Sequence, residues 1–61
     1  MKFTIRQLRL MNEKSQKEVA DYLKIHVNTY RLREEGKREF YFSDVYKVAD
    51  YFNVEVKDIR P

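Results

Sequence analysis

Residues 15–36, which read SQKEVADYLKIHVNTYRLREEG, decide the fold of this chain. Ser15 and Glu18 can form a capping box, because the serine hydroxyl accepts a hydrogen bond from the third backbone amide while the glutamate accepts one from the amide of Ser15. A helix is therefore predicted to start at Ser15, and its apolar face at positions i, i+1 and i+4 is made of Val19, Ala20 and Leu23. At about nine residues, this helix needs tertiary packing to persist.

A second helix is predicted after a break of about three residues, which is the length of a helix-turn-helix connection. The break comprises residues 24–26. Polar residues open the second helix, which covers about residues 27–35, and Gly36 stands where a left-handed C-cap would end it.

The segment before this pair is predicted to be a helix from Phe3 to about Asn12, because Ile5, Leu8 and Asn12 fall on one helical stripe. Residues 37–42, which follow the pair, are predicted to form a connector, since the sequence offers no partner for a strand there. The chain is thus expected to lack strands.

The clearest amphipathic helix comes next, where Ser43 followed by Asp44 is predicted to cap it and Asn53 to end it. Its apolar residues recur at spacings of three and four: Phe42, Val45, Val48, Ala49 and Phe52. One last short turn of helix is indicated by Val54, Val56 and Ile59. A single Gly and a single Pro argue against a turn-rich β-sandwich or barrel. The predicted fold class is all-α, a compact bundle of four to five short helices that contains a helix-turn-helix.

Length and composition indicate one small domain, residues 1–61, inside a cell. At this length only about 60% of the surface of the unfolded chain is buried on folding, which leaves room for one small core. The absence of Cys excludes disulfides and thiolate chemistry and fits a reducing compartment. No apolar run approaches the roughly 18 residues that span a bilayer, and residues 1–9 lack the apolar core of a signal peptide. We therefore expect a cytoplasmic protein.

Charge is distributed unevenly along the chain. The formal net charge is +3, but residues 1–38 hold ten basic and five acidic side chains, whereas residues 39–61 hold three basic and five acidic ones. A front of charge +5 is therefore joined to a rear of charge −2. Such asymmetry is one footprint of a polyanion-binding face, and the alternative is a solvated surface of mixed charge.

The sequence shows no catalytic constellation. A single His, no Cys and no Gly-rich loop leave no usual metal set, nucleophile–base pair or phosphate cradle. Glu34 and Glu35 are adjacent on a predicted helix, so their side chains diverge by about 100° and do not converge on a substrate. We expect no enzyme activity, no cofactor, no metal and no small-molecule ligand.

The order of these elements resembles that of the phage repressor and Cro-type (XRE-like) helix-turn-helix family of DNA-binding domains. The resemblance runs from Ile5 to Ile59. Its most specific carriers are Ser15-Gln16, which opens one helix, and the Glu-x-Gly-Lys motif at 34–37, which closes the next. The other carriers are residues 5–9 (IRQLR), Val19-Ala20 with Leu23, Asn28-Thr29-Tyr30, and residues 48–54 (VADYFNV).

The resemblance implies that the helix over about 27–35 enters the major groove, while the helix that begins at Ser15 lies across the phosphates. Tyr30 then points inward, and base contacts come from the outward face: Val27, Asn28, Arg31 and Leu32. The Asn28 amide can pair with N6 and N7 of adenine, and its alternative role is a helix-start cap. Affinity should fall steeply with salt, because phosphate contacts are expected from Gln16, Lys17, Arg33, Lys37 and Arg38.

The resemblance also implies a structural ion pair between Arg9 and Glu34, which ties the first helix to the end of the reading helix.

Five residues depart from the family pattern. Glu35 brings a negative charge to a position near phosphates that is often neutral, and Lys14 replaces an apolar residue before the capping box. Lys24 replaces a Gly, so it must accept a positive φ or adopt a different turn. His26 replaces a Ser or Thr cap and is either a tolerated turn residue or a pH switch. Arg33 stands at an apolar position, from which it can reach a phosphate or pair with a carboxylate.

Two functions remain open. The first is a Cro-type transcriptional repressor that binds a pseudopalindromic operator as a homodimer, with three candidate dimer surfaces: Phe3 with Leu10, Tyr41 with Phe42, and Val56 with Ile59. The second is a helix-turn-helix module for protein interaction, such as an anti-repressor or antitoxin, with weak nonspecific DNA binding. Asn28, Gln16 and Lys37 favour the first function. Glu35, Arg33 and the unusual turn at Lys24 keep the second open. The expected setting is the cytoplasm of a bacterial cell or a phage-infected host.

Overall fold

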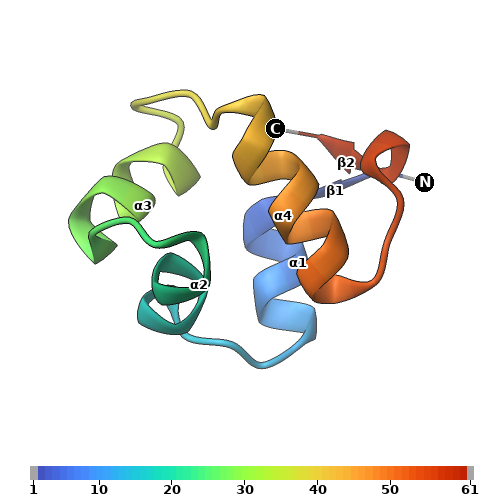
Figure 1. Ribbon diagram of the computed structural model, residues 1–61, viewed down its shortest axis with the longest axis horizontal. Coiled ribbons are helices and arrows are strands. Elements are labelled where there is room, and N and C mark those ends of the chain that lie inside the picture. Colours follow the sequence, from blue (N-terminus) through green and yellow to red (C-terminus); the bar gives the residue numbers. More distant parts are fainter. Residues whose placement is uncertain (1, 61) are drawn as a thin grey trace.

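The computed structural model describes residues 2–60, so the two end residues of the predicted domain, 1 and 61, lie outside the described part. The elements follow the order β1 (Phe3–Thr4), α1 (Ile5–Met11), α2 (Gln16–Leu23), α3 (Val27–Glu34), α4 (Phe42–Phe52), the 3-10 helix η1 (Val56–Asp58) and β2 (Ile59–Arg60). Helices α2 and α3 form one end of the molecule, and the two strands lie at the opposite end (Figure 1). The predicted all-α bundle of short helices is confirmed, with α2 and α3 as its helix-turn-helix.

A pair of two-residue strands joins the beginning and the end of the described chain. Strands β1 and β2 pair in parallel, with Phe3 opposite Ile59 and Thr4 opposite Arg60. The expectation that the chain lacks strands is wrong here, because two residues are too few to show the alternating pattern of a strand. The predicted connector, residues 37–42, contains no strand, although α4 already begins at its last residue.

Capping boxes start the first two helices. Ser15 Oγ accepts a hydrogen bond from the Glu18 amide at 3.0 Å, and Glu18 Oε1 accepts one from the Ser15 amide at 2.9 Å, which confirms the predicted start of α2. Thr4 and Gln7 form the same arrangement at 3.1 and 2.8 Å, so α1 begins at Ile5 and not at Phe3. Each box satisfies amides that a helix start leaves without partners.

Helix α4 begins earlier than its composition indicates. Its N-cap residue is Tyr41 and its first residue is Phe42, so the prediction that Ser43 caps this helix is wrong. Asp44 acts from within the first turn, where its carboxylate accepts a hydrogen bond from the Tyr41 amide at 3.3 Å. A negative charge at this position also interacts favourably with the helix dipole.

A left-handed residue follows each of the four α-helices, and the one after α1 is Glu13, with a φ of 55°. Lys24 ends α2 with a φ of 59°, Gly36 lies just beyond α3 with a φ of 83°, and Asn53 ends α4 with a φ of 56°. The predicted helix ends at Gly36 and Asn53 are confirmed. Lys24 takes the positive φ, which was one of its two predicted options and which costs a residue with a Cβ more than it costs Gly.

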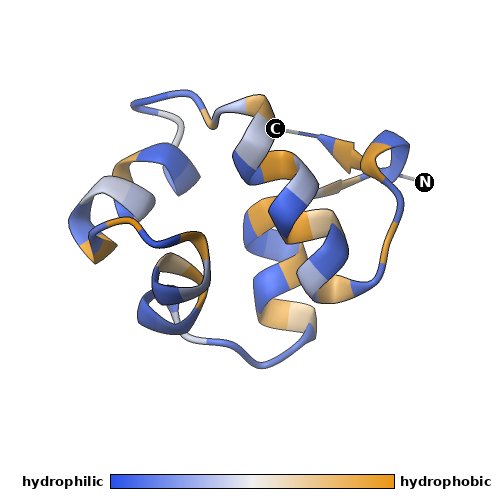
Figure 2. Cartoon of the chain, viewed as in Figure 1, coloured by the Kyte–Doolittle hydropathy of each residue, from blue (hydrophilic) through white to orange (hydrophobic). Residues whose placement is uncertain are grey.

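The core draws on the helices and on β2. Its buried apolar residues are Ile5, Leu8, Val19, Ala20, Leu23, Tyr30, Val45, Val48, Ala49, Phe52 and Ile59. Figure 2 shows that apolar segments concentrate in α1 and α4, whereas α2 and α3 are mainly hydrophilic. Phe42 departs from the apolar face predicted for α4, because it is 83% exposed. In residues 2–60, no helix has both the length and the apolar character that a membrane crossing requires.

Candidate nucleic-acid interface

The reading helix predicted from the sequence is α3, and its start is set by His26. The Nδ1 atom of His26 accepts a hydrogen bond from the Asn28 amide at 3.0 Å, so the histidine is the N-cap of this helix. An imidazole nitrogen that accepts a hydrogen bond carries no proton. The capping role therefore falls to His26, and the Asn28 side chain is exposed at the first turn.

The predicted base-contacting residues of α3 differ in exposure. Asn28 and Arg31 are exposed, and Tyr30 on the opposite side is fully buried. Val27 and Leu32 are half-buried, and Val27 packs against the core. The polar part of the predicted reading face thus lies in solvent, with two partly covered apolar side chains on the same helix.

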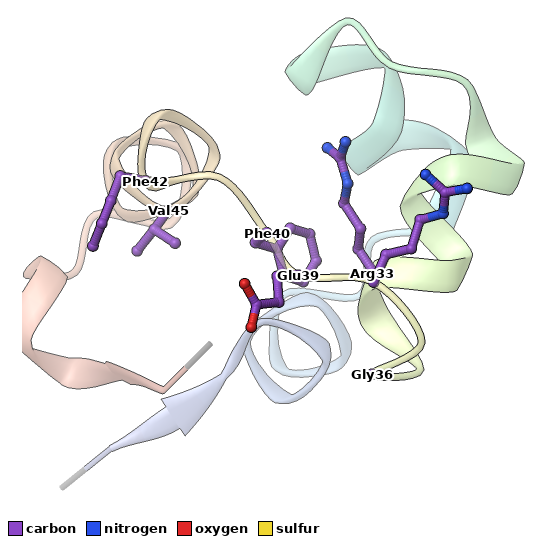
Figure 3. Close-up of a pocket in the computed structure, with 7 residues that line it drawn as sticks. Arg33, Gly36, Glu39, Phe40, Phe42 and Val45 are labelled. Atoms are coloured by element: carbon purple, nitrogen blue, oxygen red, sulfur yellow. The ribbon is translucent and has the colours of Figure 1, made fainter.

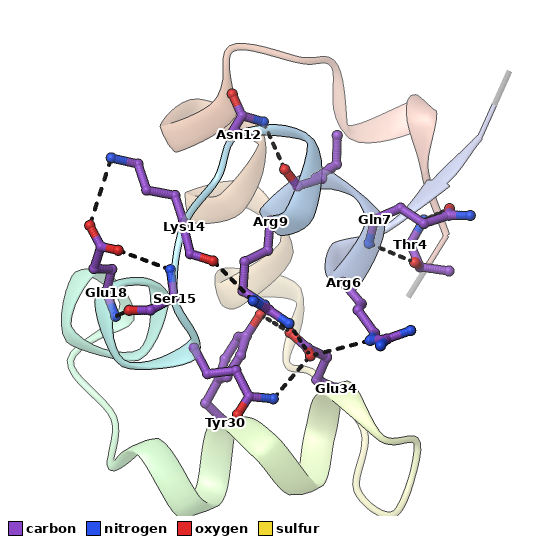
Figure 4. Close-up of polar contacts among 12 residues, drawn as sticks. Thr4, Arg6, Gln7, Arg9, Asn12, Lys14, Ser15, Glu18, Tyr30 and Glu34 are labelled. Atoms are coloured by element: carbon purple, nitrogen blue, oxygen red, sulfur yellow. Dashed lines mark hydrogen bonds and ion pairs between the residues drawn. The ribbon is translucent and has the colours of Figure 1, made fainter.

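The carboxylate of Glu34 holds three helices together (Figure 4). Arg9 on α1 donates to it twice, from Nε to Oε2 at 2.9 Å and from Nη2 to Oε1 at 3.0 Å. The Tyr30 hydroxyl donates to it from within α3, and Gln16 Nε2 on α2 donates at 3.1 Å. The Glu34 side chain is only 2% exposed. The ion pair that the resemblance implies is therefore present, and it forms part of a larger buried cluster.

The same contacts set the charge states of the Glu34 cluster. Burial acts to raise the pKa of the Glu34 carboxyl, but hydrogen bonds from Arg9, Tyr30 and Gln16 outweigh burial and hold that pKa below its ordinary value. The hydrogen bond to Glu34 raises the pKa of the Arg9 guanidinium against the effect of burial. Burial and the hydrogen bond to Glu34 together raise the pKa of the Tyr30 hydroxyl. The cluster thus keeps a charged acceptor facing its donors at neutral pH.

Gln16 and Lys17, at the start of α2, were predicted to contact phosphate. The contact between Gln16 and Glu34 places the start of α2 beside the C-terminal end of α3. Lys17 is exposed, and its Nζ atom lies 3.0 Å from Oδ2 of Asp21, one turn along α2. A pair between exposed groups is weak, so a phosphate can compete for this lysine.

Lys37 and Arg38 are the predicted phosphate contacts that follow α3. Both are exposed. The amide of Lys37 donates to the Leu32 carbonyl at 2.9 Å, which holds this segment against the last turn of α3. The Nζ atom of Lys37 lies 3.6 Å from Oε1 of Glu35, in an exposed pair. Exposed cations from α2 and from the segment after α3 therefore gather near the same end of the reading helix.

Arg33, the remaining predicted phosphate contact, lies inside the protein. Its Nη1 atom is 2.9 Å from Oδ2 of Asp44 on α4, and the two side chains are 9% and 6% exposed. Its guanidinium also lies over the ring of Tyr41, 4.5 Å from the ring centroid. Arg33 thus joins α3 to α4, which is the carboxylate pairing that the sequence left open as its alternative.

Two contacts of the site were not indicated by the sequence, namely the pairing of Arg33 with Asp44 in particular and the hydrogen bond from Gln16 to Glu34. Asp44 was predicted only as a cap. A buried cation such as Arg33, at an apolar position of its helix, needs a buried anion as its partner, and this need was the available signal. Gln16 was predicted only to contact phosphate, and nothing in the local pattern links it to Glu34. Both contacts join residues in different helices, which local spacing cannot reveal.

Comparison with known proteins gives one match. The model of a helix-turn-helix family matches residues 5–59, which include all four α-helices. No curated protein and no solved structure matches the chain.

Proposed function

Since the chain belongs to this helix-turn-helix family of DNA-binding transcription regulators, we propose that it binds double-stranded DNA sequence-specifically, with α3 in the major groove. The observation that supports this proposal is the exposed side of α3. Asn28 and Arg31 lie in solvent on this helix, and three exposed cations collect near its C-terminal end: Lys17, Lys37 and Arg38. Residues 1–61 act in this proposal as one DNA-binding domain.

Each exposed residue has a proposed task. Asn28 pairs with N6 and N7 of an adenine, and Arg31 contacts a guanine or a phosphate. Val27 and Leu32 lie against thymine methyl groups at the margins of the contact. The phosphates are bound by Lys17, Lys37 and Arg38, with Gln16 donating from the start of α2. Arg33 supports α3 through Asp44 and does not touch the DNA.

We propose further that two copies act together. One reading helix of this size covers only half of an operator, and two copies one helical turn apart cover a pseudopalindrome. Bound across a promoter, such a dimer acts as a Cro-type repressor in the cytoplasm of a bacterial cell or a phage-infected host. The family is one of regulatory DNA-binding domains, which typically carry no enzyme activity.

Selection of bound sequences from a pool of random duplexes tests the proposal. The expected result is an enriched palindromic motif. Asn28→Ala should relax the preference at one base pair of each half-site, at a cost of about 1–3 kcal/mol for the preferred base. Lys47→Ala, which removes an exposed cation from α4, is the control and should leave the motif unchanged.

Salt dependence tests the phosphate contacts separately. Lys37→Ala should weaken binding to all sequences alike and lower the slope of log K against log salt by about one unit, whereas Lys47→Ala should leave the slope unchanged. If folded protein enriches no motif even at low salt, sequence-specific binding is excluded and the protein-interaction module becomes the better hypothesis. The exposed carboxylate of Glu35, beside the phosphate-contacting segment, is the observation that fits that module.

A further inference from the structure

Three exposed aromatic residues occur within the first turns of α4 and its N-cap. They are Tyr41, Phe42 and Tyr46, which are 65%, 83% and 62% exposed, and they are called the aromatic patch below. Phe42 and Tyr46 are four residues apart and so share one face of α4. Single exposed apolar residues are common, but a group of large aromatic ones marks a surface for interaction.

A cavity adjoins this patch. Its volume is about 410 Å³, and Phe40, Phe42 and Val45 supply its apolar walls. Figure 3 shows Phe42 and Val45 on the α4 side, across from Glu39 and Phe40 on the connector. Phe42 therefore lines the cavity while most of its ring remains in solvent.

From this arrangement we propose that the aromatic patch and its cavity form the dimer interface, with a second copy of this chain as the occupant. A projecting ring beside an apolar cavity is complementary to itself, because a twofold axis brings Phe42 of each copy to the cavity of the other. This inference rests on the proposed function, which requires two copies on one operator, and it names the surface that joins them.

The charges beside the cavity also fit a second copy. Arg38 and Glu39 are neighbours in the sequence and both line the cavity. A twofold axis next to them sets Arg38 of each copy against Glu39 of the other, so each charge meets an opposite one. The guanidinium of Arg38 has five N–H donors, so it can pair with this glutamate and still donate to a phosphate. A strongly acidic or strongly basic partner meets both signs at this place and gains no such match.

The area is adequate for the centre of an interface. From their exposed fractions, the three aromatic side chains together offer about 300–500 Å² of surface. A standard interface takes about 800 Å² from each partner, out of the 4476 Å² that one chain exposes. The connector beside the patch supplies further polar area for a rim.

The location suits binding to an operator. The patch begins only three residues after Arg38, so a twofold axis at Phe42 places the two phosphate-contacting segments, which follow the C-terminal ends of the α3 helices, near that axis. The longest Cα extent of the chain is 28 Å. Two copies in contact at one edge can therefore place their reading helices one turn of DNA apart, roughly 34 Å.

Sedimentation velocity from micromolar to millimolar concentration tests this interface. The wild-type chain should show a monomer–dimer equilibrium, and Phe42→Glu should weaken it by about a hundredfold. Glutamate is well tolerated in the first turn of a helix, and circular dichroism checks that the variant is folded. Leu10→Glu, at another candidate dimer surface, is the matched control and should dimerise like the wild type. A wild-type chain that stays monomeric at millimolar concentration, or a Phe42→Glu variant that dimerises normally, overturns the proposal.

Charge exchange gives a second, independent test. Glu39→Arg and Arg38→Glu should each dimerise poorly alone, because each sets like charges against one another across the twofold axis. An equimolar mixture of the two variants should form a heterodimer, since every pair is then of opposite sign. Absence of this rescue contradicts the twofold arrangement. If the duplex selection yields a palindromic motif but the chain dimerises through a different surface, this interface is refuted and the proposed function stands.

Discussion

Replacing Glu34 by Gln should destabilise the protein far more than any exposed substitution. The change keeps the shape of the side chain but removes the charge that Arg9 faces. Arg9 donates twice to the carboxylate, at 2.9 and 3.0 Å, and its side chain is 10% exposed. The amide of a Gln offers only one acceptor oxygen, so at least one Arg9 donor meets an N–H group.

The expected loss of stability for Glu34→Gln follows from the burial of the Arg9–Glu34 pair. Removing one partner of a buried ion pair costs about 3–5 kcal/mol, because the other charge remains buried without compensation. A chain of this length is usually stable by only about 3–5 kcal/mol, so the variant should be largely unfolded at 25 °C or melt at least about 12 °C lower. Thermal and urea denaturation followed by circular dichroism measure this loss, with an osmolyte added if the variant requires it.

An exposed ion pair of the same length provides the control. Lys17 and Asp21 lie 3.0 Å apart in solvent, so Asp21→Asn should cost less than about 1 kcal/mol. A double-mutant cycle of Arg9→Met and Glu34→Gln isolates the pair itself. If Glu34→Gln costs no more than Asp21→Asn, or if the cycle shows no coupling, the assignment of Glu34 as the centre of a buried cluster is refuted.

Other substitutions test the fold and its pH dependence. The pKa of Glu34 is lower in the folded chain than the unfolded value of about 4.3, so its contribution is present above that pH and is lost as the pH falls through the folded pKa. Urea midpoints measured between neutral pH and about pH 2 should show this loss in the wild type and a smaller one in Glu34→Gln. Lys24→Gly should stabilise the folded chain by about 0.5–1 kcal/mol, because it relieves a φ of 59°. Gly36→Ala should destabilise it by about 1 kcal/mol, because alanine is strained at a φ of 83°. Melting temperatures that move in the opposite directions contradict the left-handed assignments. His26→Ala should lower the free energy of unfolding by about 0.5–2 kcal/mol, because it removes the cap, whereas His26→Ser should keep a cap and the stability. Equal stability of the two variants shows that the imidazole is not a cap.

The features that could be predicted depend on residues that are close together in the sequence. The start of α2 follows from Ser15 and Glu18, three residues apart, and the ends of α3 and α4 follow from Gly36 and Asn53. The start of α4 could not be predicted in this way, because Tyr41 is not a residue type that marks helix starts. Local chemistry therefore predicts the helices well and some of their boundaries poorly.

The contacts that hold the site together lie beyond local chemistry. Arg33 and Asp44 are 11 residues apart, and Gln16 and Glu34 are 18 apart. Each pair meets only because whole helices pack in one arrangement. Periodicity likewise assigned Phe42 to the apolar face of α4, but the first turn of that helix extends past the core. A repeating pattern tells which residues share a face and does not tell how far along the helix that face is covered.

The parallel pairing of β1 with β2 has a consequence for protein engineering. Because Phe3 lies opposite Ile59 and Thr4 opposite Arg60, the two ends of the described chain run side by side, about one strand spacing apart. A host protein could therefore carry this chain as an insert in a surface loop, since the insert would enter and leave at neighbouring points. Because the strands are parallel, a linker from residue 60 to residue 3 must turn back along the pair, so it has to be longer than a hairpin turn if new ends are to be opened elsewhere, for example in the connector between α3 and α4.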